Sequence, residues 1–235
     1  GEAANVKVRP RSYVAVERTW SDGDIVSLTL PMAIRIRRWE KNQNSVSVDR
    51  GPLTYSLKIG EKYVPKGGTE KWPAREIHPT SPWNYGLVLN TEDAAESFHV
   101  VKKEWPDTDM PFTHAGTPIE LRAKGRRIPE WQMERNGMVG ELQPGPVKSQ
   151  QPEEPITLIP MGAARLRISA FPVIGQGAEA HQWVGPPEPA FETSASHCWG
   201  SDTVSAVCDG IAPDSSNDQS IPRFTWWPHR GTEGG

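Results

Sequence analysis

Apolar and polar side chains alternate along residues 46–59, and the dipeptide Gly51-Pro52 interrupts the alternation near its middle. A period of two is typical of half-buried β-strands. Proline has no backbone N–H, so within a sheet it stands at the start of a strand or on an edge strand. We therefore expect two strands joined at a sharp corner. The positions expected to face the core are Val46, Val48, Leu53, Tyr55, Leu57 and Ile59.

The same alternation occurs earlier, over residues 13–20, 25–30 and 33–39. The four residues Ser21-Asp22-Gly23-Asp24 are typical of a hairpin turn, because Gly23 adopts a positive φ without strain. Together these segments predict an antiparallel meander of five strands. The earlier side chains expected to point inward are Val26, Leu28, Leu30, Ile34 and Ile36.

Alternating runs become short and widely spaced after residue 60. We expect loops over 60–84 and 125–155, and a loop of such length is either functional or a covering flap. About ten strands would result, enough for two packed sheets. The predicted fold is an all-β, jelly-roll-like antiparallel β-sandwich with long Pro/Gly-rich loops and an irregular C-terminal tail. The later strands are expected at 87–90, 97–103, 118–124, 156–159 and 165–171.

The character of the sequence changes after Pro172. Residues 175–189 are rich in Gly, Pro and Ala and predict a linker. We expect a β-sandwich accessory domain over 1–174. Residues 190–235 are either the truncated start of a second domain or an irregular tail, with one or two helical turns near 201–207. No alternating run follows the linker, so this part cannot build a core alone. We expect the chain to be a piece of a longer protein.

Composition narrows the classes of partner. The chain has 23 prolines and 21 glycines and is only 36% hydrophobic, a mixture that disfavours helices. Its net charge of −3, with both signs interspersed, gives no basic surface for nucleic acid or for an anionic membrane. The sequence also lacks the run of about 18 apolar residues that a membrane-spanning helix needs. We therefore expect neither nucleic acid nor a membrane as partner.

The titratable residues form no recognised catalytic or metal-binding motif. The six histidines are dispersed, and no nucleophile elbow or phosphate-binding glycine loop appears. Some carboxylates stand beside aromatic residues in the expected loops, as glycosidase acids would. However, 29 acidic residues scattered along the chain produce such neighbours by chance. These carboxylates are Glu76, Glu104, Asp107 and Asp109.

The two cysteines, Cys198 and Cys208, lie close together near the C-terminus. They can form one disulfide or remain two partly buried thiols, and both alternatives are open at this point. Neither cysteine has a second cysteine or spaced histidines beside it, so the sequence contains no zinc motif.

Aromatic residues in proline-stiffened loops are the best candidates for a recognition surface. The chain has ten tryptophans against five phenylalanines and four tyrosines. Exposed tryptophan is a usual platform for stacking on sugars, but tryptophan also fills cores and domain interfaces. The rings therefore contact a carbohydrate or a neighbouring domain, or they pack on the edge of the sandwich. The candidates are Trp72, His78, Trp83, Tyr85 and Trp131.

Several strings resemble one enzyme family, and every functional expectation below comes from that resemblance. Residues 13–39 contain W-S-D-G-D-I-V-S-L-T-L-P-M, and residues 49–58 read D-R-G-P-L-T-Y-S-L-K. With the strings at 76–87, 123–131 and 156–172, they resemble the region that follows the catalytic barrel in the β-L-arabinofuranosidase-like glycoside hydrolases, family 127. The resemblance covers roughly residues 13–174.

The resemblance implies a non-catalytic β-sandwich module that supports an (α/α)6 catalytic barrel of the same parent chain. In the family, a cysteine nucleophile, a zinc site and a glutamate acid belong to that barrel, so no catalytic or zinc-binding residue carries over to this chain. The expected partner is the barrel. The alternative is an autonomous carbohydrate-binding module that uses Trp72, Trp83 and Tyr85. A self-sufficient hydrolase is the third and weakest reading.

The segment from Ser194 resembles the opening of a galactose-binding-like domain. Its string A-V-C-D-G-I resembles the first strand and the Asp-Gly loop, which in relatives helps to hold a calcium ion. Only this resemblance points to a calcium ion near Asp209, and no other feature of the sequence supports one. We expect no cofactor in this chain.

Overall fold

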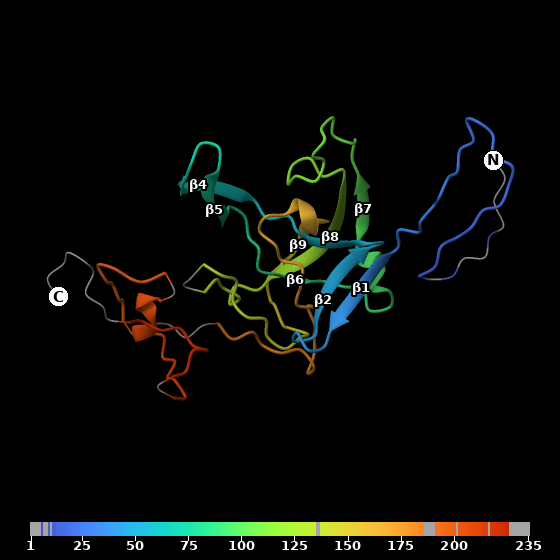
Figure 1. Cartoon of the computed structure of the whole chain (residues 1–235). Coiled ribbons are helices and arrows are strands. Elements are labelled where there is room, and N and C mark those ends of the chain that lie inside the picture. Colours follow the sequence, from blue (N-terminus) through green and yellow to red (C-terminus); the bar gives the residue numbers. More distant parts are fainter. Residues whose placement is uncertain are drawn as a thin grey trace. The chain divides into compact units, whose positions relative to one another are not determined.

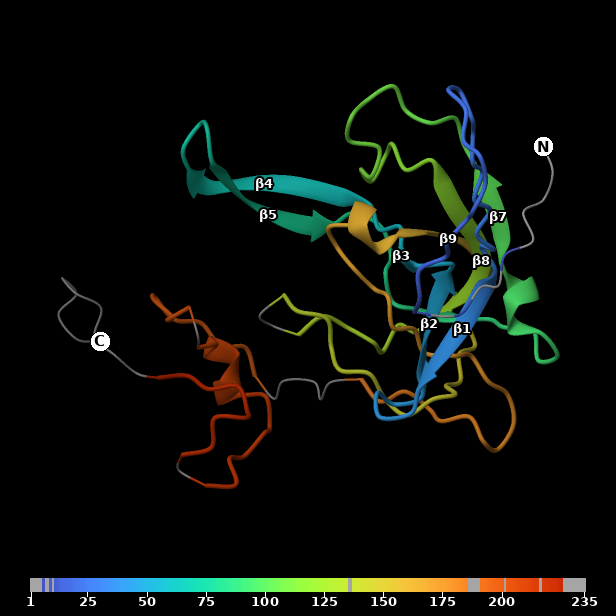
Figure 2. The same ribbon diagram turned by 45° about the vertical axis from the view of Figure 1, so that its right-hand side comes forward.

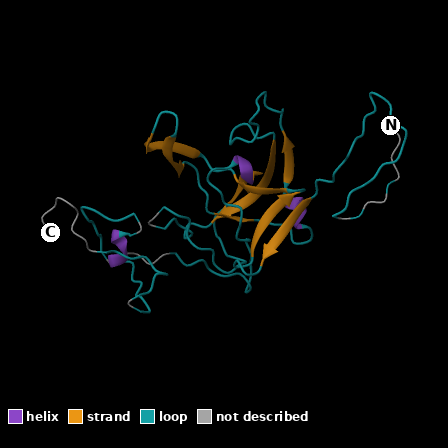
Figure 3. Cartoon of the chain, viewed as in Figure 1, coloured by secondary structure: helices purple, strands orange, loops and turns teal. Residues whose placement is uncertain are grey.

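The computed structural model describes residues 6, 9, 11–134, 137–185, 191–200, 202–215 and 217–225. Within these residues it has nine strands, three short 3-10 helices and no α-helix (Figures 1 and 3). This content confirms the predicted all-β class. No helix in the described ranges is long and apolar enough to cross a membrane. The chain divides into two units, residues 1–31 and residues 32–235.

The unit of residues 1–31 corrects two strand predictions. The described residues of 13–20 and 25–30 form no strand, and Leu28 keeps 80% of its surface exposed. The turn between them is present, since the Asp24 amide donates to the Ser21 carbonyl at 3.1 Å and Gly23 has φ +83°. An alternating pattern supplies an apolar face, but a strand also needs a neighbour to receive its backbone hydrogen bonds.

The larger unit is built on one curled antiparallel sheet (Figure 1). The order along the sheet is β1 (Ile34–Trp39), β2 (Ser45–Arg50), β3 (Leu53–Leu57), β9 (Glu153–Pro160), β8 (Ile119–Arg127) and β6 (Tyr85–Leu87), with β7 (His99–Lys102) beside β8. Strand β8 pairs with β9 along one edge, and on its other edge it pairs with β6 near one end and with β7 near the other.

The corner between β2 and β3 lies where the sequence predicts it. Gly51 has φ +57°, and Val48 pairs with Tyr55 across the corner. The predicted inward side chains Val48 and Tyr55 are fully buried, but the strands are not half-buried as expected. Ser47 and Ser56 on the opposite face are buried as well, and the Ser56 hydroxyl donates to the Ile168 carbonyl at 3.1 Å. Strands β7, β8 and β9 form where the sequence predicts strands, although β8 and β9 are longer than expected.

A short segment at 171–174 links the two ends of the curled sheet. Phe171 exchanges two backbone hydrogen bonds of 2.8 Å with Val46 of β2. Three residues later, the Ile174 amide donates to the carbonyl of Leu87 in β6 at 2.9 Å. The sheet therefore curls around the larger of two buried apolar clusters. Figure 2 shows the curled sheet from a second direction. The strand expected over 165–171 is reduced to this bridge, but Ile168 is buried as predicted.

A two-stranded ribbon replaces the loop expected over 60–84. Strands β4 (Glu61–Gly68) and β5 (Pro73–Pro79) form a separate antiparallel sheet. Gly67 and Gly68 have φ +114° and +83°, which makes the reversal possible. The prediction failed because Pro65 and these glycines hide the strand pattern, and most of the side chains are exposed on both faces.

The C-terminal part is irregular, as predicted. Its described residues beyond 190 contain one 3-10 helix, η3 (Val204–Val207), and no strand. Within the expected linker, Ala180 and Trp183 are buried, while 186–189 lie outside the described residues. The predicted domain boundaries stay a prediction. The other short helices are η1 (Ala94–Ser97) and η2 (Met161–Ala163).

Candidate functional site

Three tryptophans from distant parts of the chain stack on one another. The ring of Trp131 lies 5.2 Å from that of Trp83 in an edge-on arrangement and 5.4 Å from that of Trp183 in a tilted one. Such geometries are favourable for aromatic pairs. Trp131 and Trp183 are buried, whereas Trp83 is half-buried, so Trp83 is the only one of the three with substantial ring surface toward solvent.

A buried amide holds this stack in place. The Asn84 side chain donates to the carbonyl of Ile128 at 2.8 Å and to that of Trp131 at 3.1 Å. The Ile128 amide in turn donates to the Asn84 carbonyl at 2.8 Å. The Trp131 indole N–H donates to the Gly140 carbonyl at 2.8 Å. The turn after β8 is therefore fixed to the residue before β6, and the half-exposed ring beside it is rigid.

Trp83 forms one wall of a cleft of about 480 Å³, which we call the aromatic cleft. Arg127 also lines it, and the Nε atom of this guanidinium is buried without a hydrogen-bond partner among the described residues. An apolar ring beside polar donors is a usual composition for a small-molecule site. The lining residues are Pro79, Thr80, Ser81, Pro82, Trp83, Asn84, Arg127, Trp131, Gln132 and Met133.

The other predicted site residues are not gathered at this cleft. Tyr85 is buried in β6 and donates its hydroxyl to Glu154 Oε2 at 2.6 Å. Burial and this hydrogen bond to a carboxylate raise the pKa of Tyr85 to about 12. Trp72 is 74% exposed in the turn of the β4–β5 ribbon, and His78 is exposed on β5. Neither lines the aromatic cleft. Of the five predicted residues, only Trp83 and Trp131 come together.

Sequence reasoning missed Trp183 and Asn84. Trp183 stands in the expected linker, where its size and apolar ring were the only available signal. Asn84 directly follows Trp83 in a loop rich in proline, and no local pattern distinguishes a buried asparagine from a turn asparagine.

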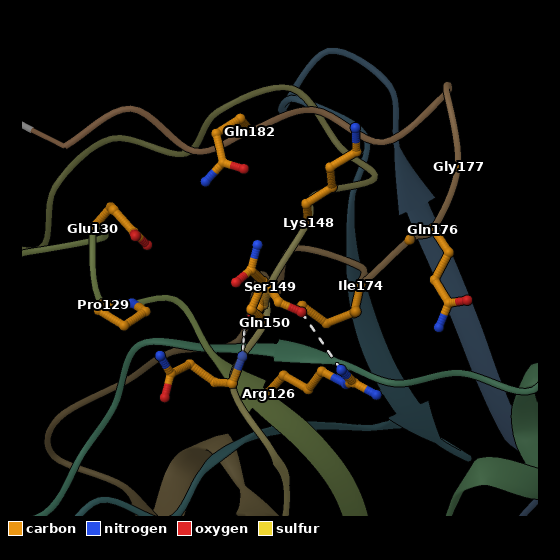
Figure 4. A pocket seen from close by; sticks show the side chains of 12 residues that line it. Arg126, Pro129, Glu130, Lys148, Ser149, Gln150, Ile174, Gln176, Gly177 and Gln182 are labelled. Atoms are coloured by element: carbon orange, nitrogen blue, oxygen red, sulfur yellow. Dashed lines mark hydrogen bonds between the residues drawn. The ribbon is translucent and has the colours of Figure 1, made fainter.

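A second cleft is lined in part by residues of the same turn (Figure 4). It has a volume of about 590 Å³, and we call it the polar cleft. Arg126 of β8 lines this cleft, whereas the next residue, Arg127, lines the aromatic cleft. The residues that line the polar cleft are Arg126, Pro129, Glu130, Lys148, Ser149, Gln150, Gln151, Ile174, Gly175, Gln176, Gly177 and Gln182.

Of the four carboxylates that we expected in loops, one lies in a strand and three lie between strands. Glu76 lies in β5, 3.0 Å from the ammonium of Lys66 and 3.4 Å from His78. The hydrogen bond from Lys66 is the main cause of the lowered pKa of Glu76. No group of three histidine, cysteine, aspartate or glutamate side chains suited to a metal ion occurs within the described ranges. Glu104, Asp107 and Asp109 stand between β7 and β8.

The most buried carboxylate of the sheet is Glu120 in β8. Its Oε1 lies 2.8 Å from the Lys58 ammonium and 2.5 Å from that of Lys103. Burial raises the pKa of Glu120, but the hydrogen bonds from both lysines outweigh it, so the pKa lies below its ordinary value. This cluster ties β8 to the residues that follow β3 and β7, and it is better suited to stability than to proton transfer.

No family model, curated protein or solved structure matches this chain. The family resemblance therefore stays a prediction.

The Asp-Gly loop and the cysteines have simple local structures. Asp209 Oδ1 accepts a hydrogen bond of 2.9 Å from the Ile211 amide, and Gly210 has φ +73°. Cys198 and Cys208 are thiols and not a disulfide, which decides between the two alternatives left open by the sequence. The Cys208 sulfur lies 3.5 Å from the Ser205 carbonyl. The calcium ion implied near Asp209 stays a prediction.

Proposed function

We propose that this chain is a non-catalytic β-sandwich module of a larger carbohydrate-active enzyme, resembling the β-L-arabinofuranosidase-like glycoside hydrolases. Its work is to support the catalytic (α/α)6 barrel of the parent protein. The observation that carries the proposal is a set of large exposed apolar side chains in 13–30. They are Tyr13, Val14, Trp20, Ile25, Val26, Leu28 and Leu30.

These seven side chains lie within 18 residues of sequence, and a contiguous exposed apolar patch marks an interaction surface in soluble proteins. The same residues belong to the string that most resembles the family, where the neighbouring part of the protein is the barrel. Burying one leucine-sized side chain contributes about 1.5–3 kcal/mol. Covering several such residues would thus hold two domains together without any specific polar contact.

The proposal is tested on the parent protein by hydrogen exchange. Backbone amides of 13–30 should exchange slowly when the barrel is present and rapidly in the isolated chain. Replacing Leu28 and Leu30 by serine should reduce self-association of the isolated chain and leave its unfolding midpoint unchanged. Equal exchange rates in the two contexts, or a parent protein that encodes no barrel, would show that the supporting role is wrong.

The aromatic cleft favours a second candidate, a carbohydrate-binding module. The observation that supports this candidate is the half-exposed Trp83 ring, which Trp131 holds rigidly in place. A rigid ring loses little entropy when it stacks on a sugar. In affinity electrophoresis on arabinan and arabinoxylan, Trp83→Ala should abolish retardation. Trp72→Ala is the matched control, because this ring is exposed away from the cleft and its loss should leave retardation unchanged.

A further inference from the structure

The polar cleft contains four carboxamide side chains that the protein itself does not use. Within the described ranges, the side chains of Gln150, Gln151, Gln176 and Gln182 have no hydrogen-bond partner. In Figure 4 the Gln150 and Gln182 carboxamides point toward the same open space. Each carboxamide offers two N–H donors and a carbonyl oxygen with two acceptor lone pairs. The cleft therefore presents donors and acceptors in similar number.

The walls of the cleft are held in place by backbone hydrogen bonds. The Gly175 amide donates to the Val147 carbonyl at 2.9 Å, and the Lys148 amide donates to the His181 carbonyl at 2.8 Å. A Cβ atom at Gly175 would lie 2.7 Å from the Cβ of Pro146, so only glycine allows this close approach. The segments that carry Lys148, Gly175 and Gln182 are thus fixed to one another, and the cleft exists before any ligand binds.

The charges around the cleft are nearly balanced. Arg126 is paired with Glu153 at 3.1 Å, and its Nη1 atom lies 3.5 Å from the Ser149 carbonyl. Its Nε atom is buried without a partner among the described residues. The remaining charges, Lys148 and Glu130, are of opposite sign and form no ion pair with each other in the described part of the chain. A charged ligand would meet one charge of each sign, so the cleft has no net preference for an anion or a cation.

We propose that the polar cleft binds a neutral, hydroxyl-rich sugar of one or two rings. Hydroxyl groups both donate and accept, as carboxamides do, and a volume of about 590 Å³ lies within the usual range for small-ligand sites. The site is distinct from the aromatic cleft, because it recognises the ligand by hydrogen bonds and has no exposed aromatic ring. It also goes beyond the supporting role, which rests on residues 13–30. The sugar-binding proposal for the polar cleft and the supporting role can each be wrong without affecting the other.

The test is an NMR titration of the whole isotopically labelled chain with L-arabinose, D-galactose and cellobiose, and with D-galacturonate as a charged comparator. We expect saturable shifts of the backbone amides of Gln150, Gln176 and Gln182 with at least one neutral sugar. The double variant Gln150→Ala/Gln182→Ala should weaken that affinity about tenfold, since it removes hydrogen bonds from two side chains to the sugar. Trp72→Ala, whose exposed ring lines neither cleft, is the control and should bind as the wild type does.

Two further measurements keep the result unambiguous. The unfolding midpoint of the double variant should equal that of the wild type, because both side chains are exposed. Should the double variant fail to fold, Gln182→Glu alone replaces it, and a negative charge at that position should still weaken binding of the neutral sugar. Absence of saturable shifts at millimolar sugar would overturn the proposal. So would tighter binding of galacturonate than of galactose, or binding that Trp83→Ala abolishes and the glutamine variants leave unchanged.

Discussion

Residues 13–30 and residues 46–59 share an alternating pattern, yet only the second segment lies in the core. Leu28 keeps 80% of its surface exposed, whereas Leu57 keeps 2%. The difference lies in the neighbours. Strand β2 has β1 on one side and β3 and Phe171 on the other, and β3 continues to β9. The first segment forms no strand within its described residues.

The comparison shows what an alternating pattern does and does not specify. It states which side chains would share a face if the segment were a strand. It does not state which distant segment will cover that face or accept its backbone hydrogen bonds. In 46–59 both conditions are met within the chain. In 13–30 we propose that another part of the parent protein meets them.

The largest expected effect is a matched pair of leucine truncations. Leu57→Ala should lower the free energy of unfolding by about 2–5 kcal/mol, because a buried leucine leaves a cavity. Leu28→Ala in the isolated chain should change it by less than about 0.5 kcal/mol, since that side chain is already exposed. Urea denaturation followed by tryptophan fluorescence measures both. Equal losses would mean that the two segments are buried alike.

Much of the core was predictable from local pattern, and much of the rest depends on long-range contacts. The phase of β2, β3 and β8 follows from alternation, because it repeats over several residues with no proline inside the strand. The bridge at 171–174 was not predictable. It pairs with Leu87, which is more than 80 positions away in sequence, and with Val46, which is more than 120 positions away. Register over such distances is decided by packing, and a single sequence carries no local signal for it.

The candidate sites were less predictable than the core. Trp83 and Trp131 were found because tryptophan is conspicuous in any sequence. Their contact was not, and neither was the anchoring role of Asn84, because a side-chain hydrogen bond over more than 40 residues has no sequence signature. The glutamines of the polar cleft are ordinary surface residues by composition. Only the backbone ladder beside Lys148 brings them around one space.

Removing an ion pair from each region should also change the free energy of unfolding, but the two losses should differ by less than those of the leucine truncations. Glu120→Gln removes a buried charge that two lysines contact, and we expect a loss of about 1.5–3 kcal/mol. Asp24→Asn weakens an exposed pair with Arg18, for which measured values are about 0–1 kcal/mol. Chemical denaturation at neutral pH compares the two variants. A larger loss for Asp24→Asn would indicate that the first unit is packed more tightly than its exposure implies.

The Glu120 pair also predicts a pH dependence of stability. The pKa of Glu120 is lower in the folded chain than its ordinary value, so the unfolded chain binds the proton more readily. The stabilisation from this group is therefore fully present above the unfolded pKa and is lost as the pH falls through the folded pKa. Between about pH 6 and pH 3, stability of the wild type should decline more steeply than that of Glu120→Gln. Parallel declines would assign the acid sensitivity to other carboxylates.

The smallest expected effect on stability comes from removing one hydroxyl group on the polar face of each segment. Thr54 on β3 donates its hydroxyl to Asp49 Oδ1 at 2.7 Å in a partly buried position. Asp49 itself pairs with Arg37 at 2.8 Å, so removing the hydroxyl leaves the carboxylate with one partner fewer. Thr54→Ala should cost about 0.5–1.5 kcal/mol. Ser27→Ala, at the corresponding polar phase of the exposed segment, should cost nothing measurable, because Ser27 is exposed.

Thr54→Ser is the control, since it keeps the hydroxyl and should retain most of the stability. If Thr54→Ala proved as neutral as Ser27→Ala, the polar face of β3 would be no more ordered than the exposed segment, and burial of the apolar face alone would distinguish the two regions.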